Sequence, residues 1–219
     1  MQHLLHSAPM ADQTWILFLY QLPSHPSTQR VYVWRRLKSC GAVYLQNSVC
    51  LLPHRTDVLR QLEEVRTEIE ARKGRARLLP VRLLESSHNA EVVRLFQQQS
   101  DEDYTEFLGR CADFHKELAH ERKSDHFTFA ELEENEVELA KLQSWLPKIR
   151  GRDFHGAATA QKAARALAAC EADFARYSKQ VGDAQGLGSS VQRRARVDRR
   201  RSRRRPVRGR GRRGHTPFG

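Results

Sequence analysis

The spacing of apolar residues changes once along this chain, near residue 87, and this change most constrains the fold. Before it, apolar runs of strand length alternate with two segments of helix length. After it, apolar residues recur every three or four positions as far as residue 180. Side chains repeat every two residues along a strand and about every 3.6 along a helix. We therefore expect a part that contains a sheet, followed by an all-helical part.

The part before residue 87 predicts the element order β-α-β-β-α-β. Strands are expected at 14–20, 42–46, 48–52 and 75–84, and helices at 28–41 and 56–74. This order matches the split-βαβ, ferredoxin-like plan, in which the fourth strand lies at a sheet edge. Pro80 supports the assignment, because proline cannot donate to a strand ladder and is tolerated at edges.

Each helix of this first part has one apolar face. In the first, Val33, Trp34 and Leu37 share a face, so Trp34 is predicted to anchor the helix on the sheet, and Gly41 marks its end. In the second, Thr56 is expected to cap the helix. The apolar positions of that helix are Val58, Leu62, Val65 and Ile69.

The predicted fold class is α+β. A ferredoxin-like βαββαβ domain is expected over 12–86, and a helical region of about four helices over 87–181. Residues 1–11 are expected to be a disordered extension, with Met10 as an alternative start, and 182–219 a Gly/Ser linker and disordered basic tail. The four helices are expected at 88–99, 101–123, 130–149 and 158–180.

The net charge of +12 is concentrated at the C-terminal end. Thirteen arginines and one aspartate lie between residues 193 and 219, whereas residues 1–192 carry equal numbers of acidic and basic side chains. Runs of like charge repel each other and often bind polyanions. Out-of-frame reading of a GC-rich gene gives the same arginine-rich composition, so charge alone leaves both origins open.

Four cysteines lie far apart, and no segment has the roughly 18 consecutive apolar residues of a membrane span. Without an export signal, the cysteines are expected to be reduced and mostly buried, in a cytoplasmic protein with no membrane partner.

Several segments in order resemble the N-terminal half of the ChrB-type chromate-resistance regulators. They are W-I-L-F-L-Y-Q-L-P at 15–23, P-S-T-Q-R-V-Y-V-W-R-R-L-K at 26–38, G-A-V-Y-L-Q-N-S-V at 41–49, F-T-F-A-E-L-E-E-N-E at 127–136 and R-D-F-H-G-A at 152–157. The resemblance covers about residues 12–180. It implies a cytoplasmic regulator that binds operator DNA, responds to chromate and often carries a second domain, which we expect this chain to lack.

Basic residues provide the candidate sites. Chromate is a tetrahedral dianion, which arginine forks and helix N-termini can bind, so we expect Arg30, His54 and Arg55 to converge on an oxyanion. A solvated basic helix face is the competing interpretation. The residues predicted to contact DNA are Arg35, Arg36, Lys38, Arg193, Arg194, Arg196, Arg199, Arg200 and Arg201.

Evidence for enzyme or metal chemistry is thin. Asp113, Glu117 and His120 share a helix face, but a carboxylate-bridged dimetal bundle needs a second Glu-x-x-His segment. The acidic positions 131–138 fit a helix start. Phosphate-loop, dinucleotide and nucleophile-elbow motifs are absent from the sequence. We expect no catalytic activity, metal or cofactor.

These observations predict a chromate-responsive transcriptional regulator module that binds operator DNA as a homodimer. The alternative is a ligand-sensing or protein-interaction module without specific DNA binding, possibly a truncated family member.

Overall fold

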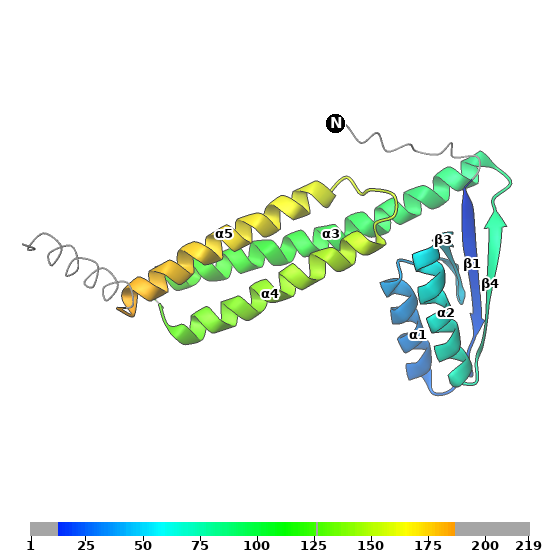
Figure 1. The fold of residues 1–219 in the computed structure, drawn as a ribbon, viewed down its shortest axis with the longest axis horizontal. Coiled ribbons are helices and arrows are strands. Elements are labelled where there is room, and N and C mark those ends of the chain that lie inside the picture. Colours follow the sequence, from blue (N-terminus) through cyan, green and yellow to red (C-terminus); the bar gives the residue numbers. More distant parts are fainter. Residues whose placement is uncertain (1–12, 126, 187–219) are drawn as a thin grey trace, which may run out of the picture.

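The computed structural model describes residues 13–125 and 127–186, which form four strands and five helices (Figure 1). In chain order these are β1 (Thr14–Gln21), α1 (Ser27–Ser39), β2 (Val43–Gln46), β3 (Val49–Pro53), α2 (Thr56–Ala71), β4 (Arg75–Arg82), α3 (Ser86–Lys123), α4 (Phe129–Arg152) and α5 (Ala160–Ala184). The α+β class and the β-α-β-β-α-β order are confirmed. The predicted extension at 1–11 and the arginine-rich tail lie outside the described residues.

The four strands form one sheet in the order β2-β3-β1-β4, with every neighbouring pair antiparallel. Pro80 lies opposite Ile16 on the edge strand β4, as the sequence predicts. Helices α1 and α2 cover one face of the sheet (Figure 1). The core beneath them contains Ile16, Phe18, Val33, Leu37, Cys40, Ala42, Cys50, Leu52, Val58, Leu62, Val65 and Ile69.

Residues next to or within α1 and α2 explain where α1 ends and which face of α2 is buried. All four predicted apolar positions of α2 are buried, whereas Thr56 is its first helical residue and Arg55 takes the cap position without a side-chain cap. Helix α1 ends where Gly41 adopts a positive φ of 84° and its amide donates to the Lys38 carbonyl. A Cβ at Gly41 would lie 2.7 Å from Phe154, so the turn also brings the α4–α5 connection against the sheet part.

The opposite face of the sheet is partly covered by the first turns of α3. Trp15 is fully buried there, stacks on Phe96 with a centroid distance of 5.4 Å, and donates from Nε1 to Asn89 Oδ1 at 2.8 Å. Val43 and Leu51 complete this second core. One helix therefore belongs both to the sheet packing and to the helical region.

The prediction of about four helices after residue 87 is wrong in one respect. The segments 88–99 and 101–123 form one continuous helix, α3, of 38 residues. Residues 98–103 contain neither glycine nor proline, so nothing in the backbone breaks the helix there, and Ser100 is buried within it. Helix α5 also runs to Ala184, past the predicted start of the linker.

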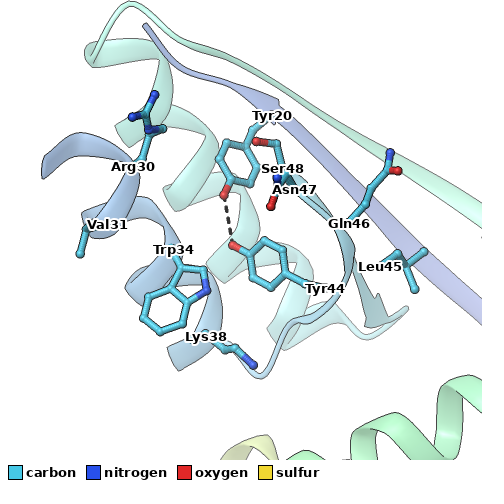
Figure 2. A pocket seen from close by; sticks show the side chains of 10 residues that line it. All are labelled: Tyr20, Arg30, Val31, Trp34, Lys38, Tyr44, Leu45, Gln46, Asn47 and Ser48. Atoms are coloured by element: carbon cyan, nitrogen blue, oxygen red, sulfur yellow. Dashed lines mark hydrogen bonds between the residues drawn. The ribbon is translucent and has the colours of Figure 1, made fainter. Parts of the chain in front are cut away.

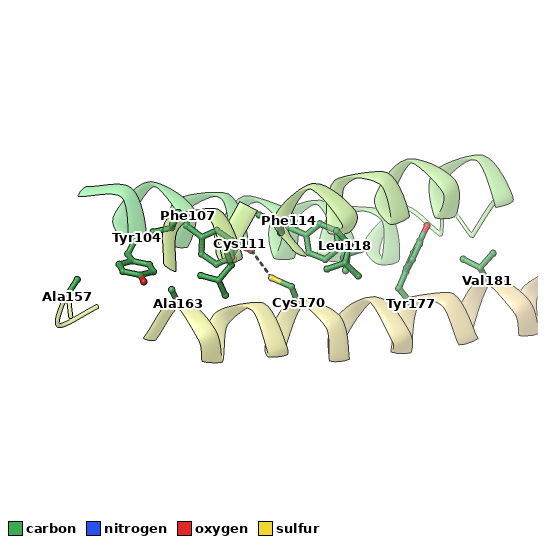
Figure 3. Packing of buried hydrophobic residues seen from close by; sticks show 14 residues of the cluster. Tyr104, Phe107, Cys111, Phe114, Leu118, Ala157, Ala163, Cys170, Tyr177 and Val181 are labelled. Atoms are coloured by element: carbon green, nitrogen blue, oxygen red, sulfur yellow. Dashed lines mark hydrogen bonds between the residues drawn. The ribbon is translucent and has the colours of Figure 1, made fainter. Parts of the chain in front are cut away.

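Helices α3, α4 and α5 pack lengthwise into a three-helix bundle (Figure 1). Its core is continuous along the bundle, and Figure 3 shows how the side chains of α3 and α5 interdigitate. The buried residues are Tyr104, Phe107, Cys111, Phe114, Leu118, Leu139, Leu142, Leu146, Ile149, Ala157, Ala163, Cys170, Tyr177 and Val181.

Candidate functional site

A groove of about 820 Å³ lies between the outer face of α1 and the β2–β3 turn (Figure 2). Helix α1 contributes Arg30, Trp34 and Lys38, which are four residues apart and therefore share one helix face. The opposite wall comes from β1, β2 and the turn. The full lining is Tyr20, Arg30, Val31, Trp34, Lys38, Tyr44, Leu45, Gln46, Asn47 and Ser48.

Trp34 is the most informative side chain of the groove, and the sequence-based prediction for it is wrong. Instead of anchoring α1 on the sheet, Trp34 is 47% exposed, and Val33 and Leu37 alone of that trio are buried. Consecutive residues of a helix differ by about 100° in direction, so the face that contains positions 33 and 37 turns position 34 toward the groove. The buried anchor of the sheet is Trp15 instead.

Two tyrosines form the floor of the groove. The hydroxyl groups of Tyr20 and Tyr44 are 3.2 Å apart (Figure 2). Burial and the hydrogen bond to Tyr20 raise the pKa of the Tyr44 phenol, so the ring stays neutral. The groove therefore combines neutral hydroxyl groups and aromatic surface with the cations of α1.

Helix α1 carries only positive charge, because it contains three arginines and one lysine but no acidic residue. Arg36 points away from the groove and binds Glu68 of α2, with Nη2 3.0 Å from Oε1. The hydrogen bond from Arg36 lowers the pKa of the Glu68 carboxyl below its ordinary value. Arg36 is thus occupied by an intramolecular partner, whereas no ion pair within the described residues involves Arg30 or Arg35.

The three residues predicted to converge on an oxyanion do not lie together. Helix α1 follows the end of β1, whereas α2 follows the end of β3, and β1 and β3 are antiparallel with Trp15 opposite Pro53. The two helices therefore begin at opposite ends of the sheet (Figure 1). Arg30 lines the groove, while Arg55 pairs with Asp57 at 2.9 Å at the far end, beside exposed His54.

The predicted DNA contacts are also divided. Arg35 is exposed on α1, and Lys38 lines the groove while its Nζ donates to Gln99 Oε1 of α3. Arg193, Arg194, Arg196, Arg199, Arg200 and Arg201 lie outside the described residues. Sequence reasoning missed Tyr20, Tyr44, Gln46, Asn47 and Ser48, because only the packing of α1 against the sheet brings them to Trp34.

Asp113 and Glu117 line a second groove of about 510 Å³ between α3 and α4, and Asp113 pairs with Lys116 at 3.0 Å. The part of the chain that the structure describes holds no cluster of three or more His, Cys, Asp or Glu side chains arranged to bind a metal ion. None of its helices is long and apolar enough to cross a lipid bilayer.

Two comparisons with known proteins point to the same family. The family model described as "Protein ChrB, N-terminal" matches residues 30–187. A curated relative, Protein ChrB from Cupriavidus metallidurans, is 22% identical over 161 residues, which cover 70% of this chain and 49% of the relative. The chain thus spans about half the length of that relative. Because the family model covers most of the chain, including most of α1 and the whole helical bundle, the chain belongs to the family of ChrB N-terminal domains.

Proposed function

We propose that the chain is a DNA-binding regulatory module of chromate resistance, and that the α1 groove is its DNA contact. Membership of the ChrB family supports the link to chromate resistance. The observation that carries the DNA contact is the exposed Trp34 between Arg30 and Lys38, on a helix without acidic residues. Cations bind phosphates, and an exposed aromatic ring contacts bases or sugars.

The groove has room for a ligand larger than a bare oxyanion. Pockets of about 300–1,000 Å³ suit ligands of drug size, and a groove of about 820 Å³ is far larger than one four-oxygen anion. Arg36 does not line this groove, and its guanidinium group binds Glu68.

The test is DNA binding by the chain shortened at Gly186, which keeps every described helix and strand. Arg30→Ala is expected to weaken binding and to lower the slope of log affinity against log salt by about 0.9, the value for one lost phosphate contact. Trp34→Ala is expected to weaken binding with little change in that slope, because the ring carries no charge. Arg60→Ala, an exposed arginine on α2, is the matched control.

Unchanged binding in both Arg30→Ala and Trp34→Ala would remove the groove from the DNA contact. If the shortened chain shows no preference between operator and unrelated DNA, the module is instead a ligand-sensing or interaction module.

A direct chromate response is the second part of the proposal. Since Arg30 and Arg55 lie at opposite ends of the sheet, one anion cannot contact both of them. We expect Arg30→Ala to reduce chromate binding in calorimetric titrations and Arg55→Ala to leave it unchanged, with sulfate as the matched anion. The reverse result would place the anion at the start of α2.

A homodimer is the third part, because two-fold assemblies suit the paired half-sites of operators. Sedimentation of the full chain tests it, and a monomer at all concentrations would contradict it.

A further inference from the structure

The interface between α3 and α5 holds a cluster of cysteine, histidine and aspartate side chains that lies outside the α1 groove. Cys111 and His115 lie one turn apart on α3, and Cys170 and Asp173 lie about one turn apart on α5. The two cysteines are 2% and 0% exposed. In Figure 3 the Cys170 side chain points at α3, with its Sγ 3.7 Å from the Cys111 carbonyl oxygen.

The cluster is connected from a carboxylate to a thiol through an imidazole. Asp173 Oδ2 is 2.8 Å from His115 Nδ1, and His115 Nε2 is 3.5 Å from Cys170 Sγ. Asp173 is held further by Arg122 at 2.8 Å and Arg176 at 3.0 Å. A carboxylate at Nδ1 favours the tautomer with its proton on Nδ1, which leaves Nε2 as an acceptor toward the thiol.

The charge state of each group fits this arrangement. Burial raises the pKa of Asp173, but hydrogen bonds from His115 and Arg122 outweigh it, so the pKa lies below its ordinary value and the carboxylate stays ionised. A hydrogen bond from the Cys170 thiol lowers the pKa of Cys111 against the effect of burial, whereas that hydrogen bond and burial raise the pKa of Cys170, which therefore keeps its proton until a base removes it. The His115 side chain is 36% exposed, so it connects the buried thiols with solvent.

We propose that Cys111 and Cys170 form a thiol oxidation site, at which hydrogen peroxide converts the pair into a disulfide between α3 and α5. The Cys111 thiol gives its proton to solvent, and the thiolate attacks one peroxide oxygen. The O–O bond breaks, the sulfur becomes a sulfenic acid, and the departing hydroxide takes a proton from solvent to leave as water. Cys170 then attacks the Cys111 sulfur as its thiol proton passes to His115 Nε2. The S–O bond breaks as the S–S bond forms, and the proton on His115 passes to the departing hydroxide, which leaves as a second water.

Two thiols and one peroxide thus yield one disulfide and two waters. A small oxidant is required because both sulfurs are buried, and His115 marks the exposed side of the cluster. His115 acts on the resolving cysteine, so its loss is expected to slow the second step more than the first. This proposal does not depend on DNA binding.

The full chain carries its own control, since Cys40 and Cys50 are also buried free cysteines. Cys50 donates to the Phe18 carbonyl oxygen at 3.8 Å, in a setting without an imidazole contact among the described residues. After graded exposure to hydrogen peroxide, peptide mass spectrometry is expected to find the Cys111–Cys170 disulfide well before any oxidation of Cys40 or Cys50. Equal oxidation of all four cysteines in the wild-type protein would overturn the proposal.

The variant His115→Gln separates the two steps. Removing a positioned base typically costs roughly 100-fold, so disulfide closure should slow by that order and a sulfenic acid at Cys111 should accumulate and react with dimedone. His120→Gln, an exposed histidine on the same helix, is the matched control. Closure at the wild-type rate in a folded His115→Gln protein would overturn the role of the imidazole.

Discussion

Trp15 holds the sheet to α3 through both the ring and the polar end of its side chain. The ring stacks on Phe96, and Nε1 donates to Asn89, which is itself buried. Within residues 13–125 and 127–186, Trp34 has neither kind of contact, and it is 47% exposed. Two tryptophans in one small domain therefore have opposite roles, one in stability and one in the groove.

Replacing each tryptophan should separate these roles. Trp15→Ala removes a fully buried aromatic ring and leaves Asn89 without its donor, so the free energy of unfolding should fall by about 3–5 kcal/mol. Trp34→Ala should change it by less than about 0.5 kcal/mol, as for most surface positions. Chemical denaturation of both variants measures this. A large loss in Trp34→Ala would mean that the ring is buried in solution.

His155 makes stability depend on pH. It packs against both Trp15 and Phe96, with centroid distances of 5.7 and 5.4 Å. Burial lowers the pKa of His155, although the Asp153 carboxylate opposes the effect. In the unfolded chain this histidine therefore takes up its proton at a higher pH than in the folded protein, at about 6.5. The free energy of unfolding falls as the pH drops below that value.

The expected result is a smaller loss of unfolding free energy between about pH 7.5 and about pH 5.5 in His155→Gln than in wild type. Exposed His120→Gln serves as the control and should keep the wild-type dependence. Identical pH profiles in His155→Gln and wild type would show that the imidazole does not carry the effect.

At the scale of elements, two glycines in helical contexts have opposite requirements. Gly41 ends α1 with a φ of 84°, and an added Cβ would lie 2.7 Å from Phe154 and 2.9 Å from Arg152 Cβ. Gly109 lies inside α3, where an added Cβ would meet no atom of the described part of the chain within 4 Å. The backbone φ angle and the room for a Cβ atom therefore decide whether alanine can replace each glycine.

Gly41→Ala is expected to destabilise the protein by more than about 1 kcal/mol, because it combines backbone strain with a steric clash. Gly109→Ala should instead stabilise it by about 0.5–1 kcal/mol, since alanine favours a helix interior over glycine. Thermal unfolding of both variants tests the pair. A neutral Gly41→Ala would show that Phe154 and Arg152 move aside without cost.

At the scale of the whole molecule, α3 connects the sheet part with the bundle. Its first turns close the second sheet core, and its later turns form the bundle core. Two hydrogen bonds cross the junction: Trp15 Nε1 donates to Asn89 Oδ1 at 2.8 Å, and Lys38 Nζ donates to Gln99 Oε1. The sheet part and the bundle are therefore joined by one continuous helix and by polar contacts to its first turns.

The arginine-rich residues 193–219 should dominate non-specific DNA binding by the full chain. They contain thirteen of its basic side chains, whereas residues 1–192 have no net charge. Ending the chain at Gly186 should reduce the slope of log affinity against log salt by several units, since each neutralised phosphate contributes about 0.9. Electrophoretic mobility shifts at several salt concentrations measure it. Equal slopes for the two chains would mean that residues 187–219 do not contact DNA.

The sequence alone determined the element order, the buried face of α2 and the edge position of β4. Each of these depends on local features: the period of apolar residues, the glycine that ends α1, and the proline that a central strand would not accept. The length of α3 was harder to predict from the sequence, because a polar stretch without glycine or proline fits both a loop and an exposed helix.

Tertiary structure alone decided which residues share a site. The antiparallel register of β1 and β3 places Arg30 and Arg55 at opposite ends of the sheet. The packing of α1 against α2 pairs Arg36 with Glu68. The packing of α3 against α5 places His115 beside Cys170, which is 55 residues away in the sequence. Periodicity specifies the face on which a side chain lies, but the partner on that face depends on packing between elements distant in sequence.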